Sequence, residues 1–337
     1  RLGLAPGFAA EILGRFRQPG LDLPAAAPRL LGPDGLTQHA SSFDRRDLIQ
    51  ALAASAPDGA AARDIRAGAD QVLADPEVVT LGREDPAGRR YTTTELLSVE
   101  ARLLERAQTR HGPAARTATP AQVQQVLEER PTLSEEQRHM VTALTTTDAS
   151  VQVVIGPAGT GKTFALDAAR AAWETAGRPV IGTALAARAA AELQAGAGIA
   201  STTIDRLLAD LDRPGPLAGL APHTVVVVDE AGMVGTRKLA RLVDHALHRH
   251  ATVVLVGDHR QLPEIEAGGA LAGLAGRVPT VELSDNRRQQ HAWERHALAE
   301  LRAGSVANAV EAYQHNRRIT LAATADDARE KMVADWW

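Results

Sequence analysis

A chain of 337 residues is long for one compact domain, so we expect two or three domains. The net charge of -4 excludes a uniformly basic protein that coats nucleic acid, although it leaves room for a local basic groove. The absence of cysteine excludes disulfides and cysteine-ligated metal centres, and it suits a reducing compartment such as the cytoplasm. No apolar stretch approaches the roughly 18–20 residues of a membrane helix, and we expect no membrane segment.

The N-terminal third reads as a small, mostly helical domain behind an irregular segment. Residues 1–43 are rich in Pro and Gly and show no sustained period, which indicates an irregular linker. Helical spacing begins after Asp44, a residue that can cap a helix, and a second helix is predicted at about 59–74. A turn-rich hairpin and a long helix follow. We therefore predict a helical accessory domain with a hairpin over residues 44–112, an element order that a winged-helix-like domain would also have.

Beyond a breaker-rich linker at 110–120, the sequence changes character. Short, nearly all-apolar strands alternate with Ala-rich helices, a pattern typical of a parallel sheet buried on both faces. We predict an α/β domain over residues 121–290. Its predicted strands are Val151–Ile155, Pro179–Thr183, Thr224–Val228, Ala251–Val256 and Thr280–Leu283.

The strongest motif is the stretch GPAGTGKT, residues 156–163, which matches GxxxxGK[ST] at every fixed position. The glycines let backbone N–H groups turn inward around a polyphosphate, and the helix that follows adds the positive end of its dipole. Lys162 would reach the β- and γ-phosphates, and the Thr163 hydroxyl would ligate Mg²⁺. The alternative is a chance glycine-rich turn, which the order of strand, motif and helix disfavours.

An acidic pair, Asp229-Glu230, directly follows the predicted strand Thr224–Val228. Open α/β sheets bind ligands at the carboxyl ends of their strands, where two carboxylates would otherwise be costly to bury. Asp229 would hold Mg²⁺ through water, and Glu230 would orient and deprotonate the attacking water. An ordinary strand-to-helix cap is the alternative.

Three further polar residues are candidates, by their positions in the sequence, for contacts to the nucleotide or to the attacking water. Gln261, in the GDHRQLP stretch that follows the strand at 251–256, would touch both the γ-phosphate and the attacking water. Arg288, with Arg287 as the alternative, would offset charge developing on the γ-phosphate, unless this is only a solvated basic turn. Gln137 carries an amide that can pair with the N6/N7 edge of adenine, although such a residue is more often solvated helix surface.

In this order, these residues resemble the superfamily 1 DNA helicases of the exodeoxyribonuclease V alpha-subunit-like type. The resemblance is strongest to the helicase region of MobF-type (TraI/TraA-like) conjugative relaxases. It spans roughly residues 132–290 and also touches the upstream stretches LTQHASSFDRRDLIQAL and RRYTTTELLSVEARLL. Its stretches are Leu133–Gln137, Gly156–Thr163, Gly182–Ala187, Thr202–Leu208, Val225–Val234, Gly257–Gly269 and Leu283–Gln289.

The resemblance implies a RecA-like P-loop fold, ATP and Mg²⁺ as cofactors, and single-stranded DNA as a partner. It also implies roles for individual residues in nucleotide binding, catalysis and DNA contact. The nucleotide contacts would be Gln137, Gly156, Gly159, Gly161, Lys162 and Thr163; the catalytic residues Lys162, Asp229, Glu230, Gln261 and Arg288; the DNA contacts Thr183, Thr202 and Thr203.

The chain departs from the family pattern in two respects. It shows no recognisable frame for the catalytic Tyr and three-His metal site of a relaxase nuclease, and residues 291–337 leave room only for the truncated start of a second motor domain. We therefore expect the missing C-terminal motor domain, and an N-terminal relaxase domain, as partners within the same polypeptide. The alternatives are a recombination helicase of the exodeoxyribonuclease V alpha type, a P-loop kinase, and a scaffold that only binds nucleotide.

Overall fold

A six-stranded sheet forms the centre of the fold, and all its neighbouring strands run parallel, in the order β5-β4-β6-β7-β3-β8. The computed structural model describes residues 20–85, 88–112, 115, 117–157, 159–213, 219–258, 267–285, 287, 289 and 291–336. The predicted α/β fold of the RecA-like type is confirmed. The strands are β3 (Val151–Ile155), β4 (Val180–Ala184), β5 (Ser201–Thr203), β6 (Val225–Asp229), β7 (Thr252–Gly257) and β8 (Thr280–Glu282).

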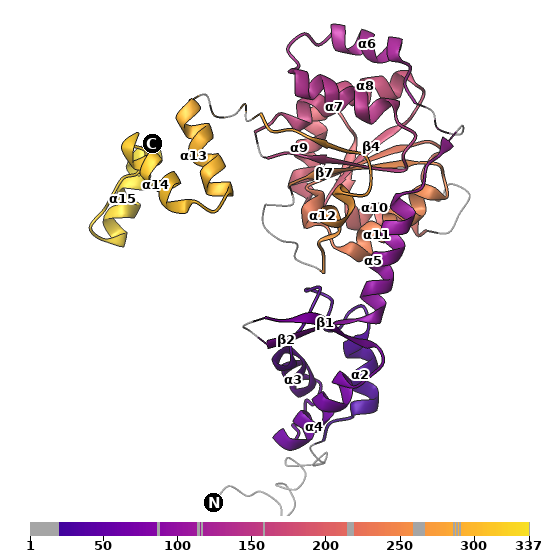
Figure 1. The fold of residues 1–337 in the computed structure, drawn as a ribbon, viewed down its shortest axis with the longest axis vertical. Helices are drawn as coiled ribbons and strands as arrows, with labels where there is room; N and C mark the ends of the chain where they lie inside the picture. Colours follow the sequence, from indigo (N-terminus) through magenta and orange to yellow (C-terminus); the bar gives the residue numbers. More distant parts are fainter. Residues whose placement is uncertain are drawn as a thin grey trace, which may run out of the picture. The chain divides into compact units, whose positions relative to one another are not determined.

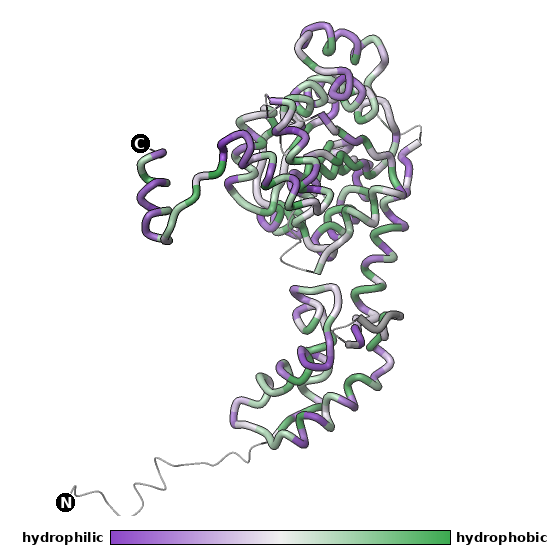
Figure 2. The backbone as a smooth tube through the Cα atoms, turned by 60° about the vertical axis from the view of Figure 1, so that its left-hand side comes forward, coloured by the Kyte–Doolittle hydropathy of each residue, from purple (hydrophilic) through white to green (hydrophobic). Residues whose placement is uncertain are grey.

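The inner strands are the most apolar part of the chain. Every residue of β3 and β7 is buried, as are the four valines of β6. In Figure 2 the apolar colouring gathers on these strands, whereas the surrounding helices alternate between polar and apolar. Such strands need cover on both faces because a parallel sheet exposes neither face to water.

Helices supply that cover on both sides of the sheet (Figure 1). On one side α10, α11, α12 and the end of α5 bury their apolar stripes against the strands in one continuous core. On the other side lie α7, α8 and α9. The helices of this domain are α6 (Pro120–Glu128), α7 (Glu135–Thr146), α8 (Lys162–Thr175), α9 (Ala187–Ala197), α10 (Ile204–Leu211), α11 (Thr236–Leu247) and α12 (Ala270–Ala275), with a 3-10 turn η2 (Ala231–Met233).

The N-terminal region forms a smaller body with its own core around Phe43, Leu48 and Leu52. From residue 20 on, where the description of the structure begins, three helices precede an antiparallel hairpin, and a long helix follows it. The helix α2 was not predicted, because Pro28 interrupts a short Ala- and Leu-rich run that shows no clear period; it is nevertheless capped by Asp22 and packs into this core. The elements are α2 (Leu23–Leu31), α3 (Arg45–Ala54), α4 (Ala62–Leu73), β1 (Val78–Asp85), β2 (Gly88–Thr93) and α5 (Thr94–Ala107).

Arg237, near the start of α11, joins this N-terminal region to the sheet domain. Its guanidinium donates to both carboxylate oxygens of Glu95 on α5, and also to the carbonyl (2.7 Å) and hydroxyl (2.9 Å) oxygens of Thr37. Nearby, the Ala267 amide donates to the Gln38 carbonyl at 3.0 Å. Arg237 therefore connects α11 by hydrogen bonds to two segments of the N-terminal region, one at Thr37 and the other at Glu95.

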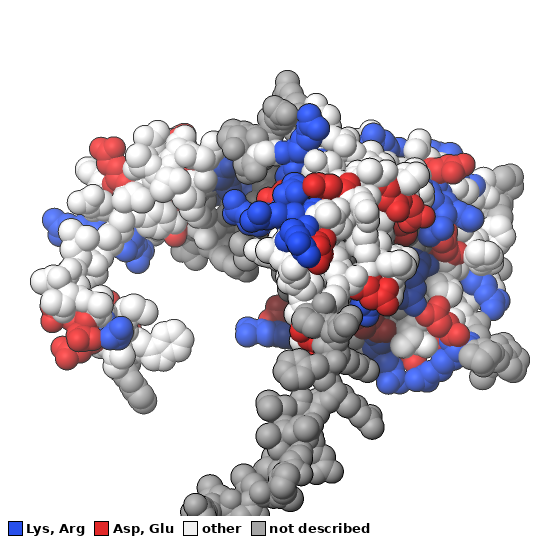
Figure 3. Space-filling model, turned by 90° about the horizontal axis from the view of Figure 1, so that it is seen from below, with Lys and Arg blue, Asp and Glu red and all other residues white. Residues whose placement is uncertain are grey.

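The chain divides into two compact units, the second formed by residues 156–162 and 283–337. In that second unit, α13 (Ala292–Arg302) and α14 (Val306–His315) pack through the buried Ala297 and Ala309, while α15 (Ala325–Trp336) buries no residue. None of the helices in the described part of the chain combines the length and apolarity of a bilayer-crossing segment. Figure 3 shows acidic and basic side chains interspersed over one face, as expected from the nearly balanced charge.

Candidate nucleotide and nucleic-acid site

Three strand ends meet at one edge of the sheet. In the parallel register Ile155 lies opposite Gly257, Val228 opposite Leu255 and Ala184 opposite Asp229. The carboxyl ends of β3, β6 and β7 are therefore neighbours, and the glycine-rich loop leaves the sheet from β3. This is the edge at which open α/β sheets bind their ligands.

The loop that leaves β3 has the backbone of a phosphate cradle. Gly159 and Gly161 have φ of 92° and 77°, a region that only glycine enters without strain. A side chain at Gly156 would place its Cβ 3.0 Å from the Thr160 hydroxyl. The local backbone thus favours glycine at 159 and 161, and a side chain at 156 would crowd the Thr160 hydroxyl.

Lys162 lies across its own loop. Its ammonium donates to the carbonyls of Gly156 at 2.6 Å and Pro157 at 3.1 Å. Within the same unit, the Arg287 amide donates to the Gly159 carbonyl at 2.8 Å. Hydrogen bonds to carbonyl groups of the loop thus help to hold its conformation.

The acidic pair lies at a strained turn after β6. Glu230 has φ of 49°, in the left-handed region that disfavours a branched or long side chain, and its amide donates to the Asp229 carboxylate at 3.0 Å. Both residues are partly buried. Backbone strain of this kind gathers at functional sites, where the surrounding structure holds it in place.

The end of β7 approaches this turn closely. A Cβ added to Gly257 would lie 3.1 Å from the Gly232 amide nitrogen, so only glycine allows β7 and η2 to approach this closely. Asp258, the next residue, is buried. Two predicted catalytic residues, Gln261 and Arg288, lie outside the described residues.

Gln137 is buried and helps to fix the start of α7. Its side-chain oxygen accepts a hydrogen bond from the Ser134 amide at 3.0 Å, while the Ser134 hydroxyl accepts from the Gln137 amide at 3.3 Å. This reciprocal pair is a capping box. The side chain therefore has a structural role that the sequence analysis did not assign to it.

A groove of about 450 Å³ lies between α9 and the edge strand β5. Alanines of α9 form one wall, and Gln194, Thr202 and Thr203 contribute polar groups. The predicted DNA contact Thr183 does not share this setting: it is fully buried within β4, so its hydroxyl is not presented to a partner at the surface. The role of Thr183 in DNA contact therefore stays a prediction, since the structure shows only that its side chain is buried on an inner strand.

The opposite, amino edge of the sheet holds a buried arginine and a group of histidines. Burial lowers the pKa of Arg178 to about 10, and its guanidinium donates to the His223 carbonyl (3.0 Å) and the Thr252 hydroxyl (2.6 Å). The His111 and His250 rings lie 5.9 Å apart, and burial lowers the pKa of His111 below its usual value. No set of three or more His, Asp or Glu residues in the described part of the chain is arranged to hold a metal ion.

Comparison with known proteins matches residues 132–324 to the family described as "AAA domain". The chain belongs to this family. It is also 34% identical to the conjugal transfer protein TraA of Rhizobium radiobacter over 310 residues, covering 90% of this chain and 28% of that protein. The expected similarity to TraA-like conjugal transfer proteins is thereby confirmed.

Two further relatives each match about half of this AAA-domain chain. The RecBCD enzyme subunit RecD of Mycolicibacterium smegmatis is 37% identical over 46% of the chain and 33% of that protein. The ATP-dependent RecD2 DNA helicase of Deinococcus radiodurans is 34% identical over 47% of the chain and 22% of that protein. The chain thus contains a helicase-like AAA domain and spans about a third or less of the length of these relatives.

Proposed function

We propose that this chain is an ATP-hydrolysing motor domain of a DNA helicase that acts on single-stranded DNA. The observation that carries the proposal is the placement, at one sheet edge, of the strand that leads into the phosphate loop and of the strand that ends at Asp229, one on each side of β7. A nucleotide-binding loop and a pair of carboxylates at the same edge of the sheet are what hydrolysis of a bound nucleoside triphosphate requires.

The residues of the loop and the acidic pair suit ATP and Mg²⁺. The positive φ of Gly159 and Gly161 turns amide groups toward a polyphosphate, and the hydroxyl and carboxylate oxygens of Thr163 and Asp229 are the donors that Mg²⁺ prefers. The metal would neutralise charge on the phosphate oxygens. Lys162 would exchange the carbonyl oxygens of its own loop for phosphate oxygens.

Catalysis in this proposal belongs to residues that act on water and on the γ-phosphate. Glu230 orients the attacking water and takes its proton, from a turn whose strained backbone fixes the direction of the carboxylate. Gln261 would contact the same water, and Arg288 would stabilise charge on the transferred phosphoryl group. Gln137 would recognise adenine in addition to closing the capping box.

The groove beside β5 is the proposed path of the DNA strand. Hydroxyl and amide groups there suit phosphate contacts, which position a strand without reading its sequence. With only 3% aromatic residues, the chain is poorly equipped for extensive base stacking, so backbone contacts would dominate. Because similarity to TraA covers most of the chain and similarity to RecD about half, a conjugative relaxase is the proposed parent, with a second motor domain and a relaxase domain as partners.

The test is ATP hydrolysis with and without single-stranded DNA. Lys162→Ala and Glu230→Gln should each lower turnover by about 100-fold or more, because each removes a group that acts in the transition state. Lys331→Ala and Glu192→Gln, at exposed positions, are the matched controls. Equal turnover in Lys162→Ala and the parent chain would refute the proposal.

The same preparation separates the alternatives. A kinase would transfer the γ-phosphate to an added small-molecule acceptor rather than to water, and a scaffold would bind nucleotide without turning it over. Thr202→Val should weaken binding of single-stranded DNA, whereas Thr142→Val, whose hydroxyl bonds only within its own helix, should leave it unchanged.

A further inference from the structure

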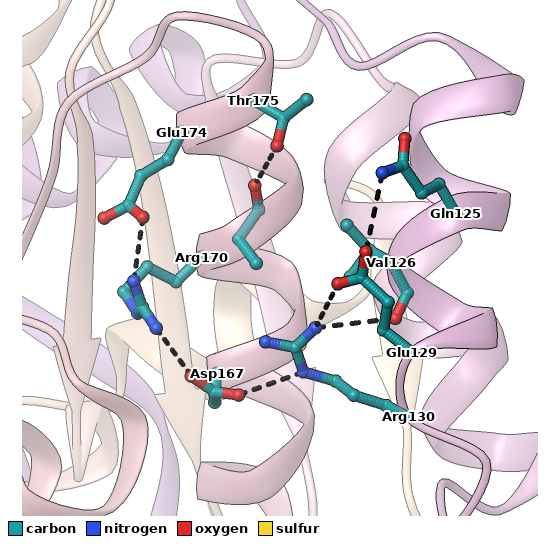
Figure 4. A network of polar contacts seen from close by, with 9 residues as sticks. Gln125, Val126, Glu129, Arg130, Asp167, Arg170, Glu174 and Thr175 are labelled. Atoms are coloured by element: carbon teal, nitrogen blue, oxygen red, sulfur yellow. Dashed lines mark hydrogen bonds and ion pairs between the residues drawn. The ribbon is translucent and has the colours of Figure 1, made fainter.

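The helix that follows the phosphate loop carries a polar stripe along one side. Thr163, Asp167, Arg170 and Glu174 are spaced four, three and four residues apart on α8, so they project from the same side of the helix. Figure 4 shows Asp167 between two guanidinium groups, that of Arg170 on the same helix and that of Arg130 beyond the end of α6. The Asp167 carboxylate accepts from them at 2.7 Å and 3.0 Å.

Thr163, the first residue of this stripe, packs against the last turn of α9. A Cβ placed on Gly196 would lie 2.6 Å from the methyl carbon of Thr163, so that the Thr163 side chain would have to move to make room for it. Thr163 therefore packs closely against α9 at a point where the glycine leaves room for its methyl group. A displacement of Thr163 toward α9 would therefore press its side chain against the backbone of that helix at Gly196.

Arg170 makes a second connection one residue further along α9. Its Nε donates to the carbonyl of Ala197 at 2.9 Å, which satisfies a carbonyl at the helix end. Gly198 ends the helix with φ of 64°, and a Cβ on it would lie 3.2 Å from the guanidinium. Because Asp167 and Glu174 each hold one terminal nitrogen of Arg170, the guanidinium has a fixed orientation against this turn.

The opposite side of α9 lines the groove. Ala187, Ala191 and Gln194 lie on the side of α9 that faces the groove. At 100° per residue, Gly196 lies about 180° around the helix axis from the middle of that side. Beyond Gly198 the chain passes through the buried Ile199 directly into β5, whose threonines also line the groove. One rigid helix thus has α8 on one side and the groove on the other.

We propose that Arg170 and Gly196 are positioning residues that couple the nucleotide site to the groove between α9 and β5. The inference rests on the proposed function, which places Thr163 at Mg²⁺ and nucleotide, and single-stranded DNA in the groove. Movement of Thr163 on nucleotide binding is passed to α9 through Gly196, and Arg170 keeps the end of α9 attached to α8 so that the helix moves as one body. Coupling of this kind is reciprocal, so DNA in the groove alters nucleotide affinity by the same factor.

The experiment measures that factor directly in the whole chain. The dissociation constant of a labelled oligothymidylate is determined with and without Mg²⁺ and a non-hydrolysable ATP analogue, and the ratio of the two values is the coupling factor. We expect the parent chain to give a factor of about 5 or more. In Arg170→Gln and Gly196→Ala the factor should fall to within about twofold of unity, while thermal melting shows a folded chain.

Two controls match the variants in chemistry. Arg188→Gln removes an exposed arginine that has the same four-residue spacing to a glutamate, and Gly276→Ala adds a methyl group where nothing lies within 4 Å. Both should keep the parent factor. Arg170→Lys, which retains the charge but cannot donate to three partners at fixed angles, should give an intermediate value.

The outcomes are distinguishable. A parent factor that persists in both Arg170→Gln and Gly196→Ala overturns the coupling proposal and leaves the proposed function intact. A parent chain that binds neither the oligonucleotide nor the analogue overturns the proposed function and, with it, the inference. Should Gly196→Ala fail to fold, Arg170→Gln and Arg170→Lys decide the question, because neither introduces a steric clash.

Discussion

The left-handed backbone at Glu230 predicts an unusual order of stability among variants of this position. In ordinary backbone, Gly is less stable than Ala by about 0.5–1 kcal/mol because it loses more conformational freedom on folding. At φ of 49° a residue with a Cβ carries an opposing cost of about 1–2 kcal/mol. The difference leaves Glu230→Gly more stable than Glu230→Ala by about 0.5–1 kcal/mol.

Comparing these two variants isolates the backbone, because both lose the carboxylate and all its interactions. For a domain of this size 1 kcal/mol corresponds to about 2–4 °C in Tm, so the Gly variant should melt about 1–4 °C higher than the Ala variant. Urea denaturation followed by circular dichroism gives the same comparison at constant temperature. Both variants should lack ATP turnover.

The opposite order, with Glu230→Ala the more stable, would show that the turn relaxes to ordinary backbone and that no strain is held there. If either variant still hydrolysed ATP, the Glu230 carboxylate would not be needed for catalysis, and the backbone strain at this position would have another cause. If the parent chain has a lower free energy of unfolding than Glu230→Gly, the glutamate lowers the stability of the fold at this position in exchange for its role in catalysis.

Three further outcomes are expected. Gly159→Ala forces a Cβ into backbone with φ of 92° and should weaken nucleotide binding by about tenfold, as measured by titration with a fluorescent ATP analogue; unchanged affinity would contradict the cradle geometry. Arg237→Ala leaves the half-buried Glu95 without its guanidinium partner and should lower the free energy of unfolding by about 2–3 kcal/mol, whereas Arg213→Ala, at an exposed ion pair, should change it by less than about 0.5 kcal/mol. Burial lowers the pKa of His111, so the unfolded chain binds the proton more readily, and stability should fall as the pH drops below 6.5; His111→Gln should flatten that slope in denaturation at pH 7 and pH 5.

The sheet domain could be predicted because its local signals agree with its tertiary structure. Apolar runs such as Val225–Val228 suit only a strand covered on both faces, and the glycines of the loop occupy backbone that other residues disfavour. The short edge strand β5 was not predicted, since Ser201–Thr203 has no apolar residue and becomes a strand only by pairing with β4. Helix α2 was missed for a similar reason, because its packing partners lie far away in sequence.

For the candidate site, sequence motifs indicate which residues matter, but not how they are oriented. Thr183 and Thr202 are alike in sequence, yet one is buried inside the sheet and the other lines a groove. The role of Gln137 in a capping box follows from its third position in a helix whose start the sequence did suggest. The spacing of Thr163, Asp167 and Arg170 could have indicated a polar stripe on α8, but not that the stripe meets Gly196.

The hydrogen bonds of Lys162 to its own loop have a consequence for which anions the loop accepts. An incoming anion has to replace two carbonyl partners of one ammonium group, at Gly156 and Pro157. A lone inorganic phosphate brings few compensating contacts, whereas a chain of phosphates meets the amides, the ammonium and the Thr163 hydroxyl together. Under the proposed function, the two hydrogen bonds of Lys162 therefore favour a polyphosphate, which can compensate for both of them, over a single small anion.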